Sequence, residues 1–398
     1  MRLGVATVDP DWRRHVQTVG TTPAIGAELQ CFPTQVMAPS VFTVVTPDGR
    51  KGRIPVDVYR HIPDGYPPDA EAEWALVLWP GMVRNVQRQR DPRNPQVSYP
   101  GYVPVGRNAV SWFPTPGMLY VVQPCTSYEQ AMLRLLPGML IYDVNGWKWG
   151  MDSLDSAHIS SFEVNDALAY HIVAAHHGVV RITFAGHSAS AIMASHYAVA
   201  AKAPDDPRLT RINDSRPRIE CAFFWSNASH LPWLDGTRPV SLQRIAELLG
   251  RELTDAESAG INDYPHGLDK LPRYFDGASA VDLAPRFLGR GCWNCFGEND
   301  DRPMTGDQPM TGLGAGAAHI AQGGMSRRRR AEEFQRNAES VARQHGVPCL
   351  MRPIMVPDTG HDPLAVFRHR PALEALFGGR VLASPAHLPA RAASWHSL

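Results

Sequence analysis

A serine stands on a short turn of small residues between a predicted strand and a predicted helix. Residues 181–197 read RITFAGHSASAIMASHY, in which Ser188 follows the strand and Ala189 opens the helix. A serine hydroxyl held clear of a sheet on such a turn can attack a carbonyl carbon once a neighbouring base takes its proton. The unpaired amide of Ala189 at the helix start would favour a developing negative charge. The turn therefore predicts a nucleophile and half of an oxyanion hole.

Two polar loops further along the chain offer the partners that such a serine needs. Residues 297–303 read GENDDRP and residues 357–363 read PDTGHDP, each directly after an apolar run. We expect His361 to act as the base. We expect Asp300 to orient it, with Asp301 as the alternative acid and Asp235 as a weaker one. A carboxylate fixes the tautomer of the imidazole, which in turn removes the proton of the serine.

The turn and the order serine, acid, histidine along the chain resemble the α/β-hydrolase superfamily. The family pattern Gly-x-Ser-x-Gly has Ser190 at its last position here, and serine is small enough for the turn. By this resemblance, the second oxyanion donor is the amide of Met82 in the loop WPGMV, where Pro80 replaces the usual histidine. The resemblance covers roughly residues 41–377 and implies a reaction that needs neither a metal nor an organic cofactor.

Short apolar runs bounded by turn residues predict the strands that must position these loops. The runs lie at 75–79, 117–123, 181–185, 219–225, 291–296 and 349–356. Because they are apolar throughout, each strand should be covered on both faces. Stretches typical of helices lie between these runs, at 161–177, 190–203 and 327–345. Strands alternating with helices predict a mostly parallel α/β sheet flanked by helices, the α/β-hydrolase architecture that the resemblance also implies.

The ends of the sheet and the domain boundaries can also be predicted. β-branched runs around a Pro-Asp-Gly turn predict a hairpin at 41–60, and Pro353 places the last strand at an edge. Residues 231–288 lack strands and carry helical patches at 242–253 and 268–275. We therefore expect a helical cap or lid inserted at 231–288. The hydrolase core would then comprise 41–230 and 289–398, after an N-terminal extension at 1–40.

Composition excludes several classes of partner. The 398 residues contain 39 Lys plus Arg and 39 Asp plus Glu, a formal net charge of zero that gives no field toward nucleic acid or anionic membranes. No run of about 18 apolar residues predicts a membrane-spanning helix. The first 20 residues lack a secretory apolar segment, and six cysteines are too few for a disulfide scaffold, so we expect a cytoplasmic protein. Homo-oligomerisation is left open.

Other polar and aromatic residues are open to two interpretations. The candidates for a substrate pocket are His187, Trp112, Trp147, Trp149 and Trp233. They can equally be buried anchors, and if they line a pocket, the substrate is apolar or aromatic. Cys292 and Cys295 lie within a predicted strand and lack a second ligand pair, which indicates structural thiols. Residues 327–330, four arginines, are expected to form the solvated first turn of a helix.

These residues together predict a serine hydrolase that cleaves a small-molecule carboxylic ester through an acyl-enzyme intermediate. An acyltransferase would use the same three side chains and pass the acyl group to another alcohol or thiol. A binding protein on the same fold would carry an unreactive serine. The sequence does not separate hydrolysis from transfer.

Overall fold

A ten-stranded sheet organises the part of the chain that the computed structural model describes, residues 8–9, 34–36, 40–63, 65–80, 115–122, 124–126, 137–210, 219–301 and 316–378. Its strands are β1 (Val8–Asp9), β2 (Thr34–Val36), β3 (Ser40–Val45), β4 (Lys51–His61), β5 (Trp74–Leu78), β6 (Gly117–Val122), β9 (Arg181–His187), β10 (Glu220–Ser226), β11 (Gly291–Gly297) and β12 (Met351–Val356). They lie in the order β1-β3-β4-β6-β5-β9-β10-β11-β12, with β2 beside β4. A small second sheet pairs β7 (Cys125–Thr126) with β8 (Ile141–Tyr142).

Strands β6, β5, β9, β10, β11 and β12 are parallel to one another, and β1 to β4 extend the sheet beyond β6 through antiparallel pairs. The six predicted core strands and the hairpin are confirmed, each within two residues at its ends. Pro353 lies on the edge strand β12, opposite Asn294 of β11. An edge position is expected for a residue that has no N–H to donate. The carboxyl ends of β9 to β12 therefore meet at one edge of the sheet.

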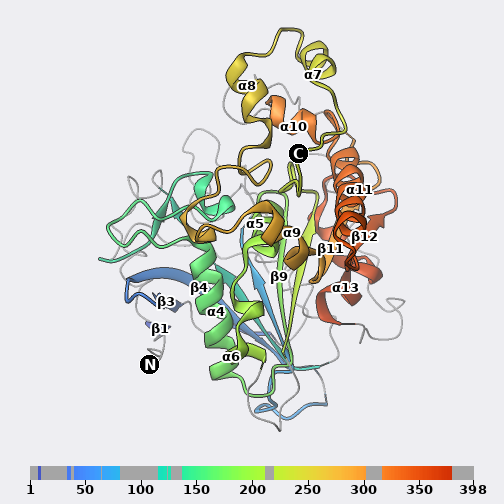
Figure 1. Cartoon of the computed structure of the whole chain (residues 1–398). Helices are drawn as coiled ribbons and strands as arrows, with labels where there is room; N and C mark the ends of the chain where they lie inside the picture. Colours follow the sequence, from blue (N-terminus) through green and yellow to red (C-terminus); the bar gives the residue numbers. More distant parts are fainter. Residues whose placement is uncertain are drawn as a thin grey trace, which may run out of the picture.

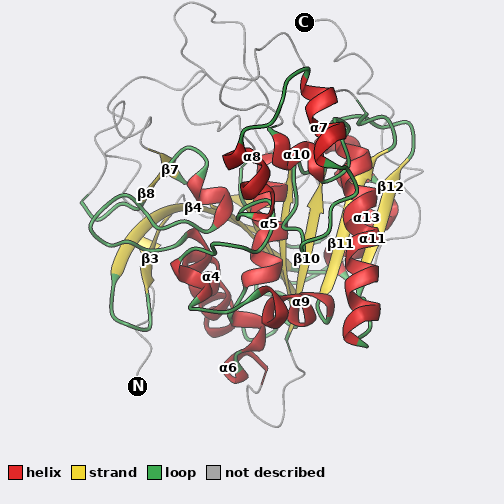
Figure 2. Cartoon of the chain, turned by 45° about the horizontal axis from the view of Figure 1, so that its top comes forward, coloured by secondary structure: helices red, strands yellow, loops and turns green. Residues whose placement is uncertain are grey.

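Helices cover both faces of this sheet (Figure 2). On one face lie α4 (Ser161–Ala175), α5 (Ala189–Ala200), α9 (Ala280–Leu288) and α11 (Arg327–His345). On the other lie α12 (Pro363–Arg368) and α13 (Arg370–Phe377). The predicted helices at 161–177, 190–203 and 327–345 are confirmed to within three residues. None of the described helices is both long and apolar enough to cross a bilayer.

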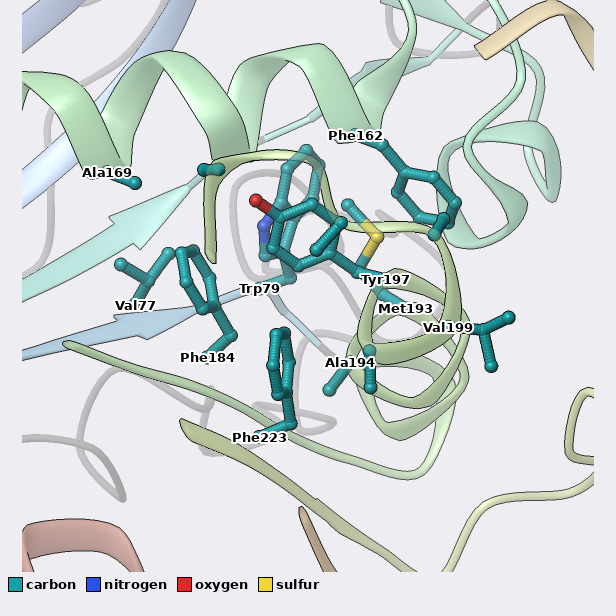
Figure 3. Packing of buried hydrophobic residues seen from close by; sticks show 14 of the residues in the cluster. Val77, Trp79, Phe162, Ala169, Phe184, Met193, Ala194, Tyr197, Val199 and Phe223 are labelled. Atoms are coloured by element: carbon teal, nitrogen blue, oxygen red, sulfur yellow. The ribbon is translucent and has the colours of Figure 1, made fainter. Parts of the chain in front are cut away.

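Aromatic rings fill the space between the sheet and α5 (Figure 3). Phe184 of β9, Phe223 of β10 and Tyr197 of α5 contact one another, with ring centroids 4.8 to 5.8 Å apart. The next residue along β10, Phe224, points to the opposite face and contacts Phe367 of α12. Successive residues of a strand point to opposite faces, so an apolar run without alternation is what a sheet covered on both faces requires.

A smaller cluster of helices gathers at the top of Figure 1. It contains α7 (Leu242–Leu249), α8 (Asp255–Ala259) and α10 (Ala317–Ala321), and α7 and α10 share an apolar cluster separate from the sheet core. Of the predicted insertion 231–288, the patch at 242–253 forms α7, whereas the patch at 268–275 forms only a 3-10 turn, Arg273–Phe275. The last part of that segment forms α9, which packs on α5 and α11.

Truncating the central aromatic contact tests this packing. Phe223 is fully buried, so Phe223→Ala removes its ring contacts and leaves a cavity between β10 and α5. We expect the free energy of unfolding to fall by about 3 to 5 kcal/mol, measured by urea denaturation. Val281→Ala on α9, where the valine is 68% exposed, should change it by less than about 0.5 kcal/mol. Equal effects of the two variants would contradict this account of the core.

Candidate active site

Ser188 lies on a sharp turn between β9 and α5. Its backbone has a φ of 60° and a ψ of −118°, a conformation that residues with a side chain rarely adopt. Gly186 makes the turn possible, because a Cβ atom there would lie 2.1 Å from the carbonyl oxygen of Ser190. The start of α5 thus packs directly on the backbone of β9, and the serine projects from the end of the strand.

Ser190 occupies the position where the family pattern has its second glycine. Its Oγ accepts a hydrogen bond from the amide of His187 at 2.9 Å and donates one to the carbonyl of the same residue at 3.0 Å. The side chain is fully buried. The departure from glycine therefore adds two hydrogen bonds inside the turn, rather than widening it.

The structure brings Ser188, His361 and Asp300 together. Ser188 Oγ lies 2.9 Å from Nε2 of His361, and Nδ1 of His361 lies 3.1 Å from Oδ2 of Asp300. A carboxylate only accepts hydrogen bonds, so Nδ1 carries the proton and Nε2 is left to accept from the serine. The side chain of Asp300 is 3% exposed and that of His361 is 33% exposed. The acid is thus enclosed, whereas the imidazole remains open to solvent on one side.

The alternative acids lie elsewhere. Asp301 is exposed and accepts a hydrogen bond from Ser326 Oγ at 2.7 Å. Asp235 accepts hydrogen bonds from Thr237 in its own turn and from the side chain of Asn337 at 2.9 Å. Of the three candidate carboxylates, only Asp300 contacts His361 among the described residues.

Asn227 holds the acid loop and the histidine loop together. It follows β10, has a positive φ of 54° and is 2% exposed. Its Oδ1 accepts a hydrogen bond from the amide of Gly297 at 2.9 Å, and its Nδ2 donates to the carbonyl of Gly360 at 3.0 Å. Gly297 must be glycine, because a Cβ atom there would lie 2.3 Å from the carbonyl oxygen of Thr359. The loops after β10, β11 and β12 are therefore fixed to one another next to His361.

The arginines at the start of α11 were expected to be solvated, and that prediction is wrong for two of them. Arg327 lies 3.4 Å from Oδ1 of Asp300. Arg330 is fully buried and donates to the carbonyl of Gly324 at 2.7 Å, and burial lowers its pKa to about 9. The reason is that α11 begins directly beside the acid loop, a proximity that the run of arginines did not indicate.

His187 lies beneath the candidate base. Its ring centroid is 4.8 Å from that of His361, and its Nδ1 lies 2.8 Å from Ser226 Oγ. The side chain is 1% exposed, and burial, together with the neighbouring His361 and Arg327, lowers its pKa well below the usual range. His187 is therefore a neutral ring that supports His361 from the core side.

One of the two predicted oxyanion donors can be located. The amide of Ala189 is the first of α5 and has no carbonyl within the helix to donate to. It directly follows Ser188 in the turn that holds the serine. Met82 and Trp112 lie outside the described residues.

The remaining tryptophan candidates divide into core and partly open positions. Trp147 is 1% exposed and stacks on Trp79, with ring centroids 5.7 Å apart. Trp233 is 2% exposed and packs beside Phe334. Both have the surroundings of buried anchors. Trp149 is half-buried and donates from its indole N–H to Nε2 of His230 at 3.2 Å.

Sequence reasoning missed Asn227, Arg327 and a cluster of three histidines, His230, His266 and His319. Asn227 carries one recognisable signal, since it is a polar residue directly after a core strand at the edge where ligands bind in open α/β sheets. The histidines come from three distant segments without the short spacing of a metal motif, so no sequence signal was available for them.

Comparison with solved structures identifies the architecture. The chain is similar to LpqC, a poly(3-hydroxybutyrate) depolymerase from Bordetella parapertussis, with 17% identity and a TM-score of 0.51 over 88% of this chain and 93% of that one. It is also similar to poly(aspartic acid) hydrolase-1 from Sphingomonas sp. KT-1, with 16% identity and a TM-score of 0.49 over 84% and 95%. No protein-family model and no curated protein sequence matches the chain.

The sheet order, the flanking helices and the likeness to the depolymerase structure agree on one fold. The chain has the α/β-hydrolase fold, as its sequence predicted. At these identities the likeness concerns the fold, so the chemistry must be argued from the side chains of this chain.

Removing the side chain of Asn227 tests its role in joining the loops. Asn227→Gly keeps the positive φ accessible but leaves the Gly297 amide and the Gly360 carbonyl without their partner. We expect the free energy of unfolding to fall by about 1 to 3 kcal/mol in urea denaturation. Asn299→Ala, which truncates an exposed side chain of the same acid loop, is the matched control. If the control costs as much, the bridge has no special role.

Acid titration tests the buried neutral state of His187. An unfolded histidine titrates near pH 6.5, whereas the pKa of His187 in the folded protein lies well below that value. Below about pH 6.5 the unfolded chain therefore binds a proton at this histidine that the folded chain does not, so His187 contributes a fall in stability of about 1.4 kcal/mol per pH unit. His187→Asn should reduce the slope of unfolding free energy against pH by about one proton. His345→Asn, which removes an exposed histidine, is the control. An equal reduction of the slope in that variant would contradict the assignment of the effect to His187.

Proposed function

We propose that this protein is a serine hydrolase that cleaves carboxylic esters, with Ser188 as nucleophile, His361 as general base and acid, and Asp300 as the residue that orients the base. The observation that carries the proposal is the hydrogen-bonded series from Ser188 Oγ through His361 to Asp300, at 2.9 and 3.1 Å. A serine on a strained strand-to-helix turn, in line with an imidazole and a buried carboxylate, is the arrangement that acyl transfer requires.

In the first half of the reaction, Ser188 Oγ attacks the carbonyl carbon of the ester while its proton passes to Nε2 of His361. The positive imidazolium is stabilised by Asp300, which accepts from Nδ1. The carbonyl oxygen becomes an oxyanion and accepts a hydrogen bond from the amide of Ala189 at the N-terminus of α5. When the tetrahedral intermediate collapses, the alcohol leaves with the proton from Nε2, and the acyl group stays on Ser188.

In the second half, water replaces the alcohol. His361 takes a proton from water, the resulting hydroxide attacks the acyl carbon, and the acid is released as Ser188 regains its proton. The one-third exposure of the His361 side chain supports access of water to this position. This exposure favours hydrolysis over transfer to another acceptor, which would need water to be excluded.

The surroundings of the acid support the same assignment of roles. Asp300 accepts from His361 through one oxygen and pairs with Arg327 through the other, so its carboxylate is held from two sides. His187 packs under the imidazole and limits the tilt of its ring. Because orientation of the base decides whether the serine proton can be taken, both contacts contribute to pre-organisation.

The preference for an ester agrees with one structural neighbour, a depolymerase of poly(3-hydroxybutyrate), whose repeating units are joined by ester bonds. We further propose that the part of the predicted insertion 231–288 that precedes α9 acts as a cap, and that Trp149, which is half-buried, contacts an apolar or aromatic part of the substrate. Cytoplasmic location belongs to the same proposal.

Substitution of the three side chains is the central test of this proposal. With an activated ester, we expect Ser188→Ala and His361→Ala each to lower kcat by about a millionfold and Asp300→Asn by about ten-thousandfold. The double variant Ser188→Ala/His361→Ala should be no worse than either single one, because groups that act as a unit are not additive. Asp301→Asn is the matched control and should retain nearly full kcat, since Asp301 is exposed and does not contact His361.

A fluorophosphonate probe gives an independent readout of the same residues. It should label the wild-type protein and the Asp301→Asn variant but not Ser188→Ala. Labelling that persists in Ser188→Ala would show that another residue is the nucleophile, and no labelling of the wild type would favour a binding protein. Ester turnover that yields mainly transfer product at low concentrations of an added alcohol would assign an acyltransferase instead.

A further inference from the structure

Three histidine side chains converge outside the candidate active-site triad. His230 lies in the segment after β10, His266 lies in the segment between α8 and α9, and His319 lies in α10. One ring nitrogen of each lies within 4.8 Å of those of the other two. The ring centroids are 4.4 to 4.7 Å apart. The cluster thus joins three segments that are distant in sequence.

We propose that His230, His266 and His319 form a binding site for a zinc ion that fastens α10 and the segment between α8 and α9 to the sheet core. Imidazole nitrogens are common ligands of zinc, and tetrahedral sites of three histidines with a fourth ligand from solvent are well established.

The geometry of the cluster is close to that of such a site. Nε2 of His319 lies 3.1 Å from Nδ1 of His230. Two nitrogens bound tetrahedrally to zinc at about 2.0 to 2.1 Å are about 3.4 Å apart, so this hydrogen-bonded pair lies about 0.3 Å closer than the site requires. The ligand nitrogens all lie within 4.8 Å of one another, so His266 must come closer by at most about 1.4 Å to complete the site, which is within the reach of a side-chain rotation.

The state of the rings also suits a metal. Nδ1 of His266 is buried without a hydrogen-bond partner among the described residues, an arrangement that is costly unless another group binds there. His266 and His319 are half-buried, which leaves a path for an ion.

Two features oppose the ion and define what must change when it binds. Lys148, Arg238 and Arg330 place positive charge near the cluster, so the fourth ligand should be negative, such as hydroxide or a carboxylate. The indole N–H of Trp149 donates to Nε2 of His230 at 3.2 Å. Binding of zinc at Nδ1 of His230 puts a proton on that Nε2, so the two N–H groups then face each other and the indole must turn away.

The tryptophan provides the sharpest variant for a test. Protein stripped with a chelator would be titrated with zinc sulfate and, separately, with cobalt(II), whose visible absorption reports tetrahedral coordination. We expect the wild type to bind one zinc ion per chain and to show a raised Tm. Trp149→Phe should bind zinc about 3- to 10-fold more tightly, because it removes the competing donor and keeps all three histidines.

Substitution of the proposed ligands should have the opposite effect, a loss of zinc binding. His266→Gln and His319→Gln should weaken zinc by more than about 100-fold and lose the zinc-dependent rise in Tm. His345→Gln, at an exposed histidine of α11, should leave binding unchanged. Circular dichroism of each metal-free variant would check that it is folded, and Trp149→Phe tests the site without touching a ligand. No zinc bound by the wild type, equal binding by the His266 and His319 variants, or weaker binding by Trp149→Phe would each overturn the proposal.

Discussion

The candidate site depends on the close approach of the loops that follow four adjacent parallel strands. Strands β9, β10, β11 and β12 lie side by side, so Ser188, Asn227, Asp300 and His361 emerge at the same edge of the sheet. Parallel pairing alone brings the loops to one edge, within several ångströms of each other. Hydrogen bonds between the side chains require the loops to be placed more accurately than this. The buried side-chain amide of Asn227 fixes them by bonding to the backbones of the loops after β11 and β12. Glycine at 297 then allows the backbones to touch.

Much of this arrangement could be predicted from the sequence because it depends on local patterns. Continuous apolar runs predict strands covered on both faces, and Ser188 is recognisable because only small residues fit the turn that holds it. Asp300 and His361 are recognisable by their place after the last two core strands, and the structure brings both into contact in the expected order. The segment 268–275 was misjudged as helical, since its apolar residues serve a 3-10 turn against the core.

The contacts that could not be predicted are those between segments distant in sequence. Arg327 and Arg330 look like a charged surface turn, and only the position of α11 beside the acid loop shows that one pairs with Asp300 and the other is buried. The histidine cluster has no spacing signal, because its members are brought together by the packing of α10 and the segment containing His266 against the loop after β10. The spacing of apolar residues indicates which face of a helix or strand is buried, but not which other segment packs against that face.

The loop after β10 links the two sites. Asn227, which positions the acid and histidine loops, and His230, which belongs to the histidine cluster, are separated by two residues of this loop, Ala228 and Ser229. Ala228 is buried, so the connection between them is packed and cannot adjust freely. The histidine cluster and the side chain that joins the acid and histidine loops therefore share one short, packed segment of backbone. Asn227 bonds to Gly297 and Gly360, next to the acid loop and next to His361, so the packing that places His230 also places the residue that joins these two loops.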